Sequence, residues 1–186
     1  EDAEQSQLVM QLALALRKEI KALEGAGVYI IQVDEPALIE TLPLRKNKQR
    51  AYTLQSIDAF KFATAVVRDT TQIHAHLYYR ECREFNKVIS TIDADVISVE
   101  AGQTESSFLS NLQKKSYKFG VGFGVGEAMK GVVERERMFD WLQHRTELVE
   151  KEQCWIAPGI GYKNKSEEET VTMFSKVIET VNRMKK

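Results

Sequence analysis

The chain has 186 residues, 43% of them hydrophobic and 28% charged, and 26 basic against 27 acidic side chains leave a formal net charge of −1. Such a composition is typical of a globular domain, and so small a charge predicts no nucleic acid and no membrane surface as partner. No apolar run approaches the roughly 20 residues that span a bilayer. Cys82 and Cys154 form no disulfide framework, so we expect a cytoplasmic protein with free thiols and small-molecule partners.

Helical and strand patterns alternate along the chain. Apolar residues at helical spacing from Leu8 to Leu23 predict a first helix that ends at the glycines Gly25 and Gly27. Residues 28–33 are nearly all apolar and predict a parallel strand covered on both faces. Further helices are expected at about 51–68, 85–92, 106–114 and 132–149, and further strands at 72–77, 96–99, 119–125 and 154–157.

The last predicted helix has a clear start signal. Ser166 and Glu169 have the spacing of a capping box, in which each side chain binds the backbone of the other. The apolar residues that follow at helical spacing predict its core face. They are Phe174, Val177, Ile178, Val181 and Met184.

Five strands separated by helices predict βα units, a parallel sheet and the α/β class over a single segment, residues 1–186. A complete (β/α)₈ TIM barrel takes about 250 residues. A barrel here would therefore be partial, with about five βα units from its C-terminal part and its N-terminal strands absent. An open, doubly wound sheet is the competing topology, and composition does not separate the two.

Ionisable residues stand where four of the predicted strands finish. They are Asp34 with Glu35, His74 with His76, Glu100, and Glu127. Each alone has a purely structural explanation, such as a carboxylate that caps a turn or a hydrogen-bonded core histidine. Ligand sites in α/β proteins lie at the carboxyl ends of the strands. Four strands that end in this way therefore predict a site at that end of the sheet.

Four motifs in this order resemble the C-terminal catalytic domain of cobalamin-independent methionine synthase. They are QVDEPAL at 32–38, LPLR at 42–45, TQIHAH at 71–76 and DADVISVE at 93–100. The likeness is collinear over almost the whole chain. It implies a TIM barrel, of which this chain matches roughly the second half, and a zinc enzyme without cobalamin that moves a methyl group from methyltetrahydrofolate to homocysteine.

The resemblance also implies roles for single residues. In the family a His, a Glu and two Cys hold zinc, which binds the homocysteine thiol and deprotonates it. His76 and Glu100 match the zinc His and Glu, and Asp34 matches the carboxylate that binds the homocysteine amino group. Glu127 stands where the family has a His that is thought to help with proton transfer, so it is the expected catalytic residue.

The chain departs from the family at both zinc cysteines, because Tyr78 and Ile160 stand in their places. Zinc sites normally have three or four protein ligands. His74 could turn inward, and Cys82 lies in a segment that is longer than in the family, so both are further candidate ligands. Zinc is thus an expectation that lacks a complete ligand set.

Two functions stay open on these grounds. One is methyl transfer from methyltetrahydrofolate to homocysteine. The other is a degenerate, non-zinc homologue that binds a small amino acid or a pterin, or acts with a partner, without methyltransferase activity. In either case half a barrel would expose the strand at 28–33. We therefore expect a homo-oligomer, or pairing with the missing half of the barrel.

Overall fold

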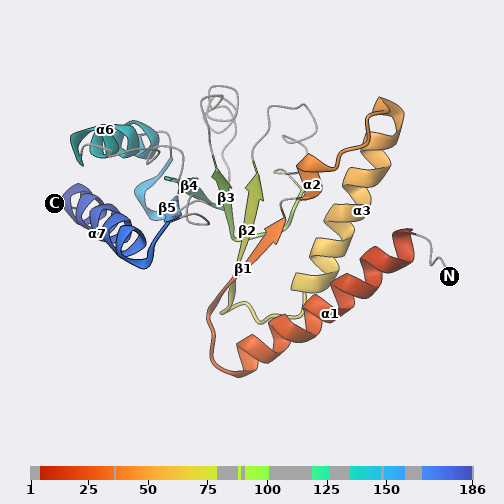
Figure 1. Cartoon of the computed structure of the whole chain (residues 1–186). Helices are drawn as coiled ribbons and strands as arrows, with labels where there is room; N and C mark the ends of the chain where they lie inside the picture. Colours follow the sequence, from red (N-terminus) through yellow and green to blue (C-terminus); the bar gives the residue numbers. More distant parts are fainter. Residues whose placement is uncertain are drawn as a thin grey trace. The chain divides into compact units, whose positions relative to one another are not determined.

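The computed structural model describes residues 5–35, 37–78, 88, 91–100, 119–125, 135–147, 149–157 and 165–185. In this part the strands are β1 (Ile30–Glu35), β2 (Gln72–Tyr78), β3 (Val96–Glu100), β4 (Gly120–Gly124) and β5 (Cys154–Ala157). The helices are α1 (Gln5–Gly25), α2 (Ala37–Glu40), α3 (Lys46–Thr64), α6 (Arg135–Thr146) and α7 (Glu167–Met184), with a 3₁₀ turn, η1 (Lys151–Gln153). Figure 1 shows these elements.

Most of the predicted elements are confirmed, with shifted ends. The first strand begins two residues later than predicted, at Ile30, and continues through Asp34 and Glu35, and α3 begins five residues earlier than predicted, at Lys46. The sequence patterns did not reveal α2 or η1. The helices predicted at 85–92 and 106–114 lie outside the described residues, apart from three positions of the first.

The strands follow one another in sequence order, β1-β2-β3-β4-β5. The pairs β1–β2 and β4–β5 are parallel. A doubly wound sheet reverses its strand order at a switch point, whereas a (β/α)₈ barrel keeps the sequence order. The α/β class is confirmed, and the order is that of a barrel and not that of the competing open sheet.

The chain divides within β3 into two compact units, Glu1–Ile97 and Ser98–Lys186, called unit 1 and unit 2 below. In unit 1, α1 and α3 pack against each other (Figure 1). Ile31 and Val33 of β1 are buried, whereas Gln32 and Asp34 between and after them are exposed. The prediction that both faces of β1 are covered is therefore wrong for unit 1. Only the alternate side chains on one face of β1 reach the core of this unit.

The end of α1 is formed by a glycine, as predicted. Gly27 has a positive φ of 90°, a conformation that costs glycine little because it has no Cβ. The N–H of Gly27 donates to the carbonyl of Glu24 at 3.0 Å, and the N–H of Val28 donates to that of Leu23 at 3.1 Å. These two bonds are those of a Schellman motif, which ends a helix and turns the chain towards β1.

Glu24 ties the end of α1 to the turn before β2. Its Oε1 accepts a hydrogen bond from the Arg68 backbone N–H at 2.8 Å and one from the Thr71 hydroxyl at 2.7 Å. These hydrogen bonds, with the Arg68 guanidinium nearby, hold the pKa of the Glu24 carboxyl below its usual value. This contact lies where β2 begins, at the opposite end of the strand from the predicted site.

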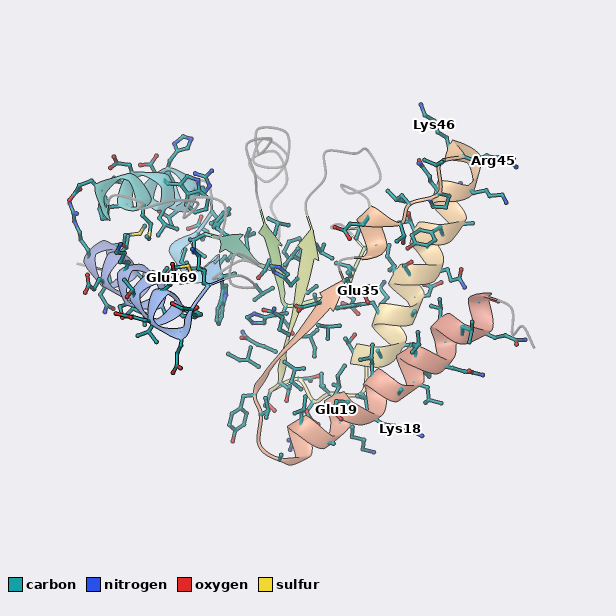
Figure 2. The ribbon with its side chains drawn as sticks, in the orientation of Figure 1. Lys18, Glu19, Glu35, Arg45, Lys46 and Glu169 are labelled. Atoms are coloured by element: carbon teal, nitrogen blue, oxygen red, sulfur yellow. The ribbon has the colours of Figure 1, made fainter. Side chains whose placement is uncertain are left out.

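In unit 2, α6 and α7 pack together over an apolar cluster. The cluster comprises Val125, Met138, Leu142, Met173 and Val177, with Trp141, Ile156, Val181 and Met184 against it. The capping box of α7 is confirmed, since the Glu169 N–H donates to Ser166 Oγ at 3.2 Å and the Ser166 N–H donates to Glu169 Oε2 at 2.7 Å. Figure 2 labels Glu169 at the start of this helix.

The predicted core face of α7 is only partly right. Val177 is buried, and Val181 and Met184 contact the cluster, whereas Phe174 is 37% and Ile178 58% exposed. The buried stripe instead passes through Met173 and Thr180, because the tertiary contacts select one of two adjacent apolar rows. Among the described residues, no helix has the length and apolarity that crossing a bilayer requires.

Candidate active site at the strand ends

Asp34 and His76 occupy adjacent positions in unit 1. The two residues are Cα partners in the parallel pairing of β1 with β2, each near the carboxyl end of its strand. Successive side chains of a strand point to opposite faces of the sheet, so these two share the face opposite Ile31 and Val33. Asp34 is exposed and His76 is 7% exposed. The structure thus brings together two of the residues that sequence reasoning selected.

Gln32 is a third residue of this face, and sequence reasoning did not single it out. Its Nε2 donates a hydrogen bond to Asp34 Oδ1 at 2.8 Å. The amide orientation follows from the chemistry, because a carboxylate accepts hydrogen bonds and does not donate them. Its spacing from Asp34 could have indicated this position, because residues two apart on a strand lie on the same face of the sheet.

His74 lies opposite Gln32 in the register of β1 with β2. It is 6% exposed, and burial lowers the pKa of its imidazole below the usual 6.5, while the charge of Asp95 raises it in part. Its Nε2 lies 3.4 Å from Gln72 Oε1. His74 therefore favours the neutral imidazole near neutral pH, a form that can accept a hydrogen bond or bind a metal.

Asp95 holds the start of β3 beside β2. Its carboxylate Oδ2 accepts from the Ile73 N–H at 2.7 Å, and its own N–H donates to the Ile73 carbonyl at 2.9 Å. Sequence reasoning included Asp95 in a family motif but gave it no role. In the structure, its two hydrogen bonds hold Ile73, the residue that precedes His74, in register with the start of β3.

Glu35 ends β1 beside Asp34 but has a different environment (Figure 2). It is half-buried, and burial raises the pKa of its carboxyl. Because strand side chains alternate, Glu35 belongs to the face of Ile31 and Val33, not to that of Asp34. The two neighbouring carboxyls thus point to opposite faces of the strand, and only Asp34 belongs to the exposed row.

The structure does not describe the side chains of the other predicted site residues. Glu100 is the last residue of β3 and belongs to unit 2, and its side chain is outside the description, like that of Tyr78 at the end of β2. Cys82, Glu127 and Ile160 lie outside the described residues altogether. Among the side chains that are described, no three His, Cys, Asp or Glu residues form a group that could hold a metal ion.

Unit 2 brings β3 and β4 unusually close at a buried serine. A Cβ placed on Gly122 would lie 2.8 Å from Ser98 Cβ and 3.0 Å from Ser98 Cα, with the Ser98 hydroxyl nearer still. Ser98 is two residues before Glu100, and so shares its face of β3. Gly122 therefore allows β4 to pack closely against the strand that carries Glu100, as expected for glycine within a strand.

Cys154 begins β5, as predicted, and its thiol is free. Burial raises the pKa of this thiol to about 11, so it stays protonated and is a poor nucleophile at neutral pH. It lines a cavity of about 640 Å³ in unit 2, together with Phe139, Ile156, Val181, Arg183 and five other residues. Cys154 thus lies at the amino end of β5, opposite to the strand end at which the site is predicted.

The strand order and the polar residues at the carboxyl ends of β1 and β2 place this protein in the class of barrel-type α/β proteins. In that class, ligands bind at the carboxyl ends of the strands. The family model described as "Cobalamin-independent synthase, Catalytic domain" matches residues 1–183. The chain belongs to this family, which confirms the resemblance of its motifs.

Curated relatives agree with this assignment. The chain is 40% identical over 172 residues to a 5-methyltetrahydropteroyltriglutamate–homocysteine methyltransferase of Streptococcus agalactiae, which covers 92% of this chain and 23% of that protein. It is 36% identical over 179 residues to the protein of the same description from Bacillus subtilis, covering 96% and 24% of the two chains. The chain thus spans about a quarter of the length of these relatives.

A solved structure agrees with the fold. The chain is similar to a B12-independent methionine synthase of a Shewanella species in complex with selenomethionine, with a TM-score of 0.70 and 19% sequence identity. The match covers 97% of this chain and 56% of that one. At this level of identity the likeness concerns the fold alone, and it supports the barrel topology inferred from the strand order.

Proposed function

We propose that this protein takes part in the transfer of a methyl group from a methyltetrahydrofolate to homocysteine, without cobalamin. The family match and the descriptions of the relatives support this function. The observation that carries it is the pairing of Asp34 with His76 at the ends of β1 and β2. The family match also supports a single catalytic-domain segment over residues 1–186.

Asp34 is proposed to bind the amino group of homocysteine. Its carboxylate is exposed on the open face of β1, where a small ligand can reach it. An ammonium group bound to a carboxylate forms a charge-assisted hydrogen bond, which is shorter and stronger than a neutral one. The contact orients the amino acid and leaves its thiol end free to reach the next strand.

His76 and Glu100 are proposed as metal ligands, with His74 and Cys82 as further candidates, and Glu127 as the group that moves a proton. The described residues do not supply a zinc donor set, because they contain no group of three suitable side chains. Tyr78 and Ile160 stand at the cysteine positions of the family. The donor set is therefore a question for metal analysis.

The test combines metal analysis with homocysteine binding. Zinc content and zinc affinity would be measured for the full chain and for His76→Ala, and homocysteine binding for Asp34→Asn by calorimetry. We expect stoichiometric zinc that His76→Ala loses, and about a tenfold weaker affinity for homocysteine in Asp34→Asn, the loss expected for one charge-assisted hydrogen bond. Glu147→Gln, an exposed change in unit 2, is the control.

The outcomes separate the two functions. Zinc and homocysteine binding that both depend on these side chains would support methyl transfer, which a turnover assay with methyltetrahydrofolate then checks. Homocysteine binding without zinc would leave the degenerate homologue, which binds a small amino acid or a pterin. Binding of neither zinc nor homocysteine would contradict the proposal.

The remaining properties follow from the same proposal. Homocysteine and a folate-type methyl donor are the proposed small-molecule partners. We also infer a cytoplasmic location, in keeping with a chain whose described cysteine is a free thiol. Because β1 lies at one end of the strand order, we propose that the chain forms a homo-oligomer or pairs with the rest of a barrel.

A further inference from the structure

The side-chain hydrogen bond between Gln32 and Asp34 joins two residues of the same strand. Gln32 Nε2 and Asp34 Oδ1 are 2.8 Å apart, and the two residues are two positions apart on one strand. Both are exposed on the face of β1 opposite Ile31 and Val33. A bond within one strand joins no two elements of the fold. Its effect falls on the orientation of the Asp34 side chain.

That orientation matters for any cation that Asp34 receives. An exposed aspartate otherwise samples several rotamers, and ordering such a side chain on binding costs free energy. With Oδ1 held by Gln32, the second oxygen, Oδ2, keeps its lone pairs for an ammonium group. The Gln32 carbonyl oxygen, Oε1, is a further acceptor on the same face. The pair therefore offers two kinds of acceptor to a group with three N–H donors.

We propose that Gln32 is a positioning residue, which holds the Asp34 carboxylate in the orientation that receives the amino group of homocysteine. This inference rests on the proposed function of Asp34. On this proposal, binding of the amino group depends on Gln32 as well as on Asp34, whereas binding of the thiol does not depend on Gln32. Gln32 therefore determines specificity for amino thiols over thiols that lack the amine.

The test compares two ligands that differ only in the amine. Binding of L-homocysteine and of 4-sulfanylbutanoate would be measured by calorimetry on the full chain and on Gln32→Met, which keeps the length of the side chain and removes its amide. We expect about a fivefold or greater loss of homocysteine affinity and less than about a twofold change for 4-sulfanylbutanoate, in line with one hydrogen bond to a charged group.

Gln11→Met is the matched control, because Gln11 is also exposed but belongs to α1 and not to the sheet. Its affinity for homocysteine should equal that of the parent chain. Circular dichroism spectra of both variants should match that of the parent chain, which shows that neither change unfolds β1 or β2.

Three other results would contradict the role proposed for Gln32. A parent chain that binds homocysteine, with a Gln32→Met variant that binds it equally well, would remove the role of Gln32 and leave that of Asp34. An equal loss for both ligands would mean that Gln32 supports the strand and not the amine site. A parent chain that does not bind homocysteine would remove the proposed function as well.

Discussion

At the scale of single residues, His74 of β2 shows how burial changes the pKa of a side chain. His74 is buried beside Asp95, and desolvation lowers the pKa of its imidazole more than the carboxylate raises it. In the unfolded chain this histidine takes up a proton at its usual pKa, near 6.5. Below that pH the unfolded state therefore binds more protons than the folded state, and stability falls as the pH falls.

His74→Gln should remove this acid sensitivity. The free energy of unfolding of the parent chain should decrease as the pH falls from about 6.5 through the lowered pKa of the folded state, and the variant should show a shallower decrease over the same range. Urea titrations between about pH 7.5 and about pH 5 measure both curves. The exposed His144 of α6 provides the control as His144→Gln. Parallel curves for His74→Gln and the parent chain would refute this expectation.

Sequence reasoning identified Asp34, His74 and His76 because polar residues at the ends of apolar strands are conspicuous. It did not single out Gln32, because a glutamine on an exposed strand position has no distinctive pattern. Its role depends on the position of one amide relative to one carboxylate, 2.8 Å apart. Only atomic positions supply that distance.

At the scale of elements, local sequence signals predicted the end of α1 and the start of α7. The Schellman motif at Gly27 and the capping box of Ser166 with Glu169 both formed where the sequence placed them. Such motifs depend on residues within one turn of each other, so distant contacts alter them little. The core face of α7 is different, because Met173 or Phe174 could each face inward until packing selects one.

The close approach of β3 to β4 supports a prediction about Gly122. Gly122→Ala should destabilise the protein by about 1–3 kcal/mol, the usual cost of overpacking, because the added Cβ would overlap Ser98. Adding Ser98→Gly should restore part of the loss, since the Ser98 Cα would still lie 3.0 Å from that Cβ. Chemical denaturation measures the free energy of unfolding of each variant.

Gly25→Ala is the control for this experiment. A Cβ on Gly25 would meet no atom within 4 Å, and Gly25 is the last residue of α1. Alanine favours a helix more than glycine does, so this variant should be at least as stable as the parent chain. Equal destabilisation by both substitutions would contradict the proposed overlap with Ser98.

At the scale of the whole molecule, the exposed start of β1 predicts association. Tyr29 is 69% and Ile30 48% exposed, and β1 lies at one end of the strand order. Unpaired strand edges with apolar side chains bind other chains. We expect light scattering to show a mass that rises with protein concentration, and Ile30→Lys to lower it.

Leu54→Lys is the matched control for association. Leu54 lies on α3 and is 49% exposed, close to the value for Ile30, and the substitution adds the same charge away from the strand edge. It should leave the dependence of mass on concentration unchanged. A monomer at every concentration would contradict the prediction for the parent chain.

The sequence by itself determined the α/β class, the family and the order of most elements, because periodicity, caps and motifs are properties of short segments. Tertiary structure decided the barrel-type strand order, the face of β1 that is buried, and the pairing of Asp34 with both Gln32 and His76. These depend on which segments pack and in what register, and a register is set by contacts between residues far apart in the chain.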